Sequence, residues 1–263
     1  MLRSFRLRST DLSTCLLFCR DALSLSLLRG SAAGGLLCVG ESGGCSELHL
    51  AGAAAAAASL PAPVPAALPY PFLTYGVSNL RTSARHAGRH GGQPLALAAE
   101  ADASQEAHFL LPGSAGGVRL LHLFRRNPTV SLTLGLASPE QGAQLLCAVL
   151  GMRVLAGQEA ALARPRAGRH SLVLAGPGQE PHNTTSLVLE QWEAGGASSS
   201  SSSSGCALAP EEQATLCVAV PDTRAALQQC LGLGLPTTPL SSAGSFVTEL
   251  MDGSCSLHCV QAR

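Results

Sequence analysis

Two histidines in the first half of the sequence, His86 and His90, have a spacing that could serve metal chemistry. Imidazoles four residues apart lie on the same side of a helix and could chelate one ion, and histidine is a common zinc ligand. The other interpretation is that both lie at the solvated end of a helix that Gly91-Gly92 terminates. The spacing alone leaves both open, and the second is the simpler prediction.

Three further donors, Cys255, His258 and Cys259, lie close together near the C-terminus. On a β-strand the two cysteines share one face and His258 points to the other, so the three cannot converge on one ion. His122 lies in a comparable alternating segment, Leu120 to Phe124. It is either an outward polar residue of a strand or a ligand and base at the end of that strand.

The composition excludes several classes of function. The 263 residues carry 17 basic and 17 acidic side chains, and every basic residue is arginine. A net charge of zero argues against nucleic-acid binding, which needs a clustered basic surface. No uninterrupted apolar segment is long enough to predict a membrane span. We expect a globular protein with a sizeable core, since 46% of its residues are hydrophobic.

The cysteines and the N-terminus bear on localisation. Ten scattered cysteines without a Cys-x-x-Cys pair indicate reduced, mostly buried thiols and a cytoplasmic protein. The alternative is mitochondrial, because the first ten residues are rich in arginine and serine. Asp11 and Asp21 interrupt that pattern, and a folded role for the segment is the preferred interpretation.

Two low-complexity segments divide the chain into four blocks. Residues 51–69 hold an alanine run followed by prolines, and residues 194–210 hold seven consecutive serines. Neither can bury enough surface to order itself, so both are predicted to be inserts. The remaining blocks, at 1–50, 70–126, 128–193 and 210–263, each favour the order β-α-β-β-β from their apolar spacing.

The first and third blocks align without a gap at an offset of 127 residues. Apolar residues coincide through both the first strand and the helix, as in the pairs Phe5/Leu132, Leu7/Leu134, Leu23/Leu150 and Leu27/Val154. A β-α-β-β-β unit exposes one apolar sheet face and must bury it against another copy. The predicted fold is therefore α+β, with two tandem domains of paired modules at 1–127 and 128–263.

The segment Leu145 to Leu155, with its decayed copy at Leu17 to Leu28, resembles the helix-to-strand element of the vicinal oxygen chelate superfamily. The superfamily includes glyoxalases, bleomycin-resistance proteins and dioxygenases, and the resemblance extends over the chain outside the two inserts. It implies glyoxalase-like domains, with a divalent metal, Zn²⁺ or Ni²⁺, held by the first and last strands of each module. It also implies a small-molecule substrate such as a glutathione adduct.

Few positions of the family's site are retained. In the first domain the four ligand positions fall on Ser4, Glu47, Phe72 and Leu121. Glu47 is the retained metal ligand, and His122, next to Leu121, is the candidate substitute ligand and catalytic base. Arg8 matches the arginine that holds the glutathione carboxylate. In the second domain the positions fall on Ser131, Glu190 or Leu189, Thr215 and Leu257, with His258 adjacent.

Two functions follow from this resemblance and remain open. The first is a metal-dependent lyase like lactoylglutathione lyase, which isomerises an aldehyde-glutathione hemithioacetal using Glu47, His122 and Arg8. The second is a non-catalytic module that keeps the scaffold to bind a small molecule or a protein. The lost ligand positions favour the second, because one carboxylate among hydroxyl groups is a poor site for Zn²⁺ or Ni²⁺.

Overall fold

The computed structural model describes residues 2–31, 36–40, 47–52, 70–95, 105–113, 116–124, 128–180, 184–191, 214–240, 245–249 and 255–261. Within these ranges the chain forms four β-α-β-β-β modules, as the sequence predicts. The first module consists of β1 (Leu2–Ser9), α1 (Leu12–Ala22), β2 (Ser26–Ser31), β3 (Leu36–Gly40) and β4 (Glu47–Gly52). The second consists of β5 (Phe72–Val77), α2 (Leu80–Arg89), β6 (Gln93–Pro94), β7 (Glu106–Leu110) and β8 (Gly117–His122).

The third module contains one short helix, α4, that the apolar spacing does not predict. Its elements are β9 (Thr129–Leu136), α3 (Pro139–Leu150), β10 (Arg153–Leu155), α4 (Gly157–Ala161), β11 (Ser171–Ala175) and β12 (Ser186–Gln191). The fourth module consists of β13 (Ala214–Val220), α5 (Thr223–Gly232), β14 (Thr237–Pro239), β15 (Phe246–Glu249) and β16 (Cys255–Gln261). None of the helices described is long and apolar enough to cross a membrane.

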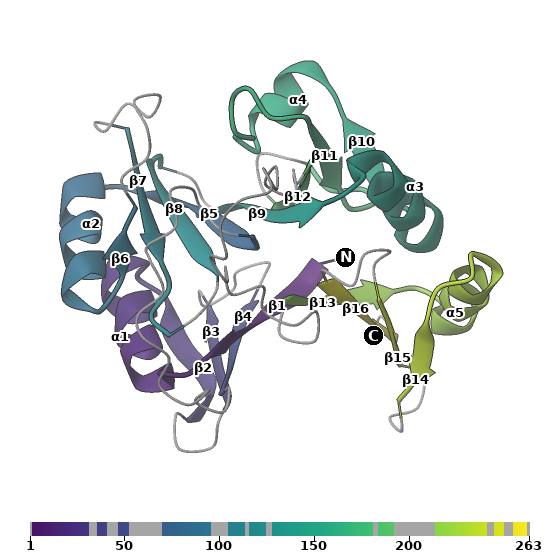
Figure 1. The fold of residues 1–263 in the computed structure, drawn as a ribbon, viewed down its shortest axis with the longest axis horizontal. Coiled ribbons are helices and arrows are strands. Elements are labelled where there is room, and N and C mark those ends of the chain that lie inside the picture. The colour runs from purple at the N-terminus through teal and green to yellow at the C-terminus, as the bar shows by residue number, and fades with distance from the viewer. Residues whose placement is uncertain are drawn as a thin grey trace, which may run out of the picture.

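The strands form two eight-stranded sheets, seen one above the other in Figure 1. Sheet A has the order β14-β15-β16-β13-β1-β4-β3-β2, and sheet B has the order β10-β11-β12-β9-β5-β8-β7-β6. Two modules join at the centre of each sheet, where β1 pairs with β13 in sheet A and β5 pairs with β9 in sheet B. Both pairs are antiparallel. Module one therefore shares a sheet with module four, and module two shares one with module three.

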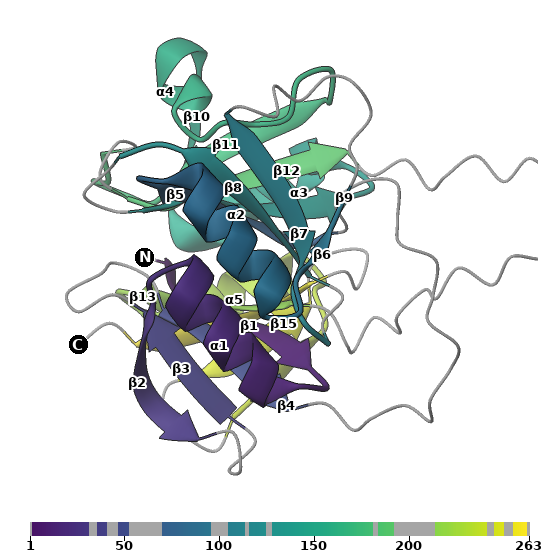
Figure 2. The ribbon, with the colours of Figure 1, turned by 90° about the vertical axis from the view of Figure 1, so that its left-hand side faces the viewer.

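This pairing differs from the expected grouping of modules one with two and three with four. Both sheets contain strands from either side of residues 127 and 128. The division into domains at this point stays a prediction. Modules adjacent in sequence meet through helices instead: α1 packs on α2, and α3 on α5. Figure 2 shows α1 and α2 side by side, with strands of sheet A behind α1 and of sheet B behind α2. All four modules share one apolar alternation, so the sequence could not indicate which strand edges pair.

The core lies between the two sheets and is lined by alternate residues of their central strands. Phe5 and Leu48 from sheet A belong to the same buried cluster as Leu73 and Leu132 from sheet B. Because side chains alternate along a strand, their neighbours point to the opposite, outer face of each sheet. The repeat is visible in exposure as well, since Leu27 and Val154, 127 residues apart, are 45% and 49% exposed.

The helices α1, α2, α3 and α5 begin where a short polar side chain caps their first turn. Asp11, Asn79, Ser138 and Asp222 each accept a hydrogen bond from a backbone N–H of the helix that follows. These bonds satisfy donors that the first turn would otherwise leave unpaired. The ends of the predicted inserts are corrected slightly: Ala51 and Gly52 belong to β4 and pair with Arg8 and Ser9. Residues 53–69 and 192–213 lie outside the described ranges.

Candidate functional site

The outer face of sheet A carries a row of four polar residues on four adjacent strands. Ser4 of β1 is the register partner of Glu47 on β4 and of Cys217 on β13, and Cys217 is the partner of His258 on β16. These are first and last strands of two modules, the strands that the family resemblance assigns to the site. The row Glu47–Ser4–Cys217–His258 is the candidate site.

The register corrects two sequence assignments. Leu257 is fully buried in the core, so the last-strand position on the outer face is His258. Thr215 does lie on the outer face, but its partner on β1 is Arg6, and Cys217 is opposite Ser4. Cys217 was missed because it lies two residues beyond the predicted position. It could have been found only by knowing that β13 pairs with β1.

Glu47 is engaged by two neighbouring side chains. Its Oε2 lies 2.6 Å from Nη2 of Arg29 and 3.0 Å from Nε2 of His49. The donor types of the row, a carboxylate, a thiol and an imidazole, suit zinc chemically. Geometrically, however, no three histidine, cysteine, aspartate or glutamate side chains in the described ranges are placed to hold a metal ion. The arranged donors therefore do not fit the Zn²⁺ or Ni²⁺ that the resemblance implies.

A cation stands beside this row. Arg6 is exposed on the outer face of sheet A, between Thr215 of β13 and His49 of β4. Within the described part of the chain its guanidinium makes no hydrogen bond and no ion pair. Nε2 of His258 is buried there without a hydrogen-bond partner. Burial lowers the pKa of His258, and the nearby Arg6 charge lowers it further. The face thus presents a cation and a neutral imidazole.

The structure does not bring the three predicted site residues together. Glu47 lies in sheet A, but His122 is exposed at the end of β8 in sheet B. Leu121 is buried on that strand. Arg8 pairs through its backbone with Ala51 of β4, and its side chain lies outside what the structure describes. The functional roles of Glu47, Arg8 and His122 stay predictions.

The outer face of sheet B has an equivalent row that is covered by the chain itself. Ser186, Ser131, Thr74 and Arg119 are register partners across β12, β9, β5 and β8. The Ser131 hydroxyl donates to the carbonyl of Ala163 at 2.9 Å, and Nη1 of Arg119 donates to the carbonyl of Arg164 at 2.7 Å. Both acceptors belong to the segment that follows α4.

The charged side chains Glu190 and Arg119 on this face are also paired. Glu190 is fully buried and contacts Arg166, while Leu189 points into the core. The last-strand position of this module, which the sequence left between Leu189 and Glu190, is therefore Glu190. Arg119 donates through Nε to Glu106 at 2.8 Å. Burial lowers the pKa of His108 to about 4, and the charges of Arg119 and Arg166 add to this effect while Glu106 opposes it.

The two clusters singled out in sequence have structural roles. His90 ends α2, as predicted, and its Nε2 lies 2.8 Å from Oδ2 of Asp21 on α1. The His86 and His90 rings are stacked with their centroids 6.4 Å apart. Cys259 is buried in the core while its neighbour His258 faces outward, so these two donors diverge as expected.

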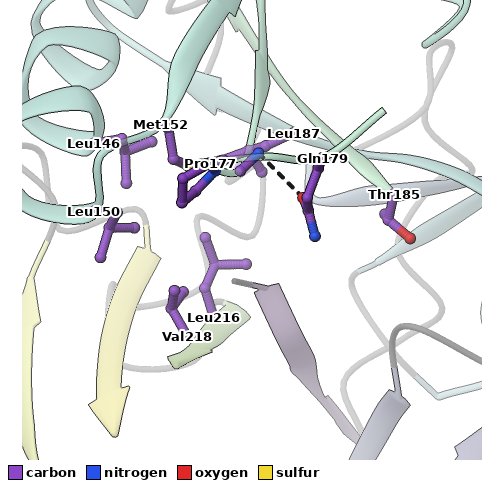
Figure 3. A pocket seen from close by; sticks show the side chains of 10 residues that line it. Leu146, Leu150, Met152, Pro177, Gln179, Thr185, Leu187, Leu216 and Val218 are labelled. Atoms are coloured by element: carbon purple, nitrogen blue, oxygen red, sulfur yellow. Dashed lines mark hydrogen bonds between the residues drawn. The ribbon is translucent and has the colours of Figure 1, made fainter. Parts of the chain in front are cut away.

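A narrow apolar pocket lies apart from both outer faces. Figure 3 shows it between α3, the start of β12 and β13. Leu146, Leu150, Leu216 and Val218 line it, and no titratable side chain does. It is a gap in the packing between the sheets, and its lining offers no group for catalysis.

The comparisons with known proteins agree with this architecture. Glyoxalase I from Zea mays superposes with a TM-score of 0.64 at 14% identity, covering 99% of this chain and 92% of its own. A putative dioxygenase from Bacillus subtilis superposes with a TM-score of 0.59 at 11% identity, covering 99% and 84%. The chain has the glyoxalase fold. No protein-family model and no curated protein matches the sequence. At these identities the likeness establishes the fold alone, and the activity has to be argued from the site.

Proposed function

We propose that this glyoxalase-fold protein is a binding module that holds a small anionic molecule on the outer face of sheet A. The observation that supports it is Arg6, an exposed cation without an ion-pair partner in the described chain, set beside His258. A guanidinium offers paired donors that match a carboxylate or phosphate. Arg6, two residues before the predicted Arg8, would anchor the ligand, and the half-buried Cys217 and His258 would line its other side.

The donor arrangement favours binding over metal-dependent isomerisation. A bound divalent metal would polarise adjacent oxygens of a substrate. Glu47 instead accepts from Arg29 and His49, and the described donors do not converge on a common point. In this proposal the ion pair of Glu47 and Arg29 holds β4 and β2 together. The bound molecule is released without having reacted.

A lyase like lactoylglutathione lyase is the second candidate, supported by the full-length likeness to a glyoxalase I. It would act on an aldehyde-glutathione hemithioacetal with Glu47 as metal ligand. By the number and order of its modules the chain would then resemble glyoxalase domain-containing protein 4. The two candidates share a small-molecule ligand and differ in whether a metal is required.

Elemental analysis separates the two candidates. Wild-type protein and Glu47→Gln are purified identically and assayed for zinc and nickel. The binding module predicts no stoichiometric metal in either. About one ion per chain in the wild type, lost in the variant, would contradict the binding module and lead to an isomerisation assay.

Calorimetric titration with S-lactoylglutathione tests the anchor. We expect binding by the wild type and at least about tenfold weaker binding by Arg6→Gln, since a charge-assisted hydrogen bond contributes about 1.5–3 kcal/mol. The matched control is Arg81→Gln, an equivalent change at an exposed position on α2. Equal weakening in both variants would point to net charge and refute a specific role of Arg6.

A further inference from the structure

The guanidinium of Arg166 is held on the outer face of sheet B as a ligand would be. Its Nε lies 2.8 Å and its Nη2 2.7 Å from Oε2 of Glu190. Its Cζ lies 4.9 Å from the centroids of both the Tyr70 and the Phe72 rings. Carboxylate pairing and contact with aromatic faces are the two interactions that a planar cation favours.

The groups around this guanidinium are held in place by one another. Glu190 is fully buried, and the Tyr70 hydroxyl donates to its Oε2 at 2.8 Å. The Tyr70 ring lies over Gly135, the backbone partner of Glu190, where a Cβ would come within 2.4 Å of the ring. The absent side chain at Gly135 thus makes room for the ring that flanks the cation. We name this arrangement of Tyr70, Phe72 and Glu190 the cation clasp.

The segment that delivers Arg166 is attached to the sheet mainly through the carbonyls of Ala163 and Arg164 and through Arg166 itself. Ala163 is the one buried residue between positions 157 and 170, and most of the others are exposed. Gly157 and Gly168 flank the segment with φ values of 55° and 71°, and a Cβ added at either glycine would meet no atom within 4 Å. Few buried side chains and glycines at both ends are typical of a segment that can open locally.

We propose that the cation clasp is a binding site for guanidinium compounds, which the chain fills with Arg166 as an internal ligand. A free guanidinium compound would bind when residues 157–170 move away and Arg166 leaves. Because only the open molecules can bind, the apparent affinity of the wild type for the compound is the intrinsic affinity multiplied by the open fraction. This site is separate from the anionic-ligand site of sheet A and does not depend on it.

Agmatine, a small guanidinium compound, is the probe. Calorimetric titrations compare the wild type with Arg166→Ala, with the double variant Arg166→Ala/Glu190→Gln, and with Arg224→Ala, a control at an exposed position on α5. We expect Arg166→Ala to bind agmatine at least tenfold more tightly than the wild type and the control do. The double variant should lose this gain. Putrescine, which replaces the planar group by an ammonium, should bind Arg166→Ala more weakly than agmatine does.

Three results would overturn the proposal. These are unchanged agmatine affinity in folded Arg166→Ala, a gain that survives Glu190→Gln, and equal binding of putrescine. If Arg166→Ala does not fold, Arg166→Ser replaces it, since serine also leaves the space of the guanidinium empty. Hydrogen exchange on the wild type gives an independent measurement: saturating agmatine should speed exchange in residues 157–170, and unchanged exchange would also refute the proposal.

Discussion

Replacing Glu190 by glutamine removes the only charge opposite Arg166 in the cation clasp. In the native protein the carboxylate accepts from Nε and Nη2 of Arg166, from its backbone N–H at 3.3 Å and from the Tyr70 hydroxyl. The amide of glutamine offers one acceptor and turns a donor toward these donors. The guanidinium is left without a counter-ion beside a fully buried side chain.

The cost follows from this burial. Breaking a buried ion pair by removing one partner destabilises a protein by about 3–5 kcal/mol. The Arg166 side chain keeps 16% of its exposure and some hydration, so the lower end applies, about 3 kcal/mol. Arg166→Met in the Glu190→Gln background should cost less than it does alone, because the charge that it would leave unpaired is already gone.

Urea unfolding of the wild type, both single variants and the double variant measures this coupling. Urea is required, because guanidinium chloride would itself supply a ligand for the clasp. We expect a coupling energy of at least about 1 kcal/mol between the two sites, within the range for residues in contact. A loss below about 1 kcal/mol for Glu190→Gln, or strictly additive single variants, would refute the description of this pair as a buried, mutually dependent unit.

Three smaller predictions concern packing and protonation. Gly135→Ala should destabilise by about 1–3 kcal/mol in urea unfolding, through overlap with the Tyr70 ring, whereas Gly88→Ala, in open space on α2, should stabilise by up to about 1 kcal/mol. Because the pKa of His108 is about 4 against an ordinary value of 6.5, the unfolded chain takes up a proton first as pH falls. Stability should therefore drop by about 3 kcal/mol between pH 6.5 and 4, and His108→Gln should remove this dependence. Burial raises the pKa of the Cys15 thiol to about 11, so it should resist iodoacetamide at pH 8 until the protein unfolds, as mass spectrometry of digests would record.

The sequence predicted the modules well because each module is a local pattern. Apolar spacing from Asp11 to Leu23 corresponds to α1, and the alternation of Val130 to Leu136 corresponds to β9. The offset of 127 residues holds in three dimensions, since Phe5 and Leu132 are both buried in the core. The helix α4 was missed because its five residues are too short for an apolar period to show.

The site could not be assembled from sequence because it depends on pairing between distant strands. Ser4 meets Cys217 only through the antiparallel register of β1 and β13, which are separated by most of the chain. A register shift of one residue also reverses the face of a strand, so Leu257 and His258 could not be told apart without the partner strand. Arg166 gave no signal, because an arginine in a loop has no periodicity to reveal what it contacts.

The two sheets share a topology but differ in what satisfies their outer faces. On sheet A, Arg6 and the Nε2 of His258 have no partner in the described chain, so polar groups remain for a ligand to satisfy. On sheet B, Ser131, Arg119 and Glu190 are contacted by Ala163, Arg164 and Arg166 from one segment. The hydroxyls of Thr74 and Ser186 in the same row are buried without a hydrogen-bond partner in the described chain. An unpaired buried polar group costs free energy until something binds it. A ligand on the outer face of sheet A should therefore stabilise the protein directly, whereas a ligand on the outer face of sheet B must first replace the contacts that Arg166 already makes.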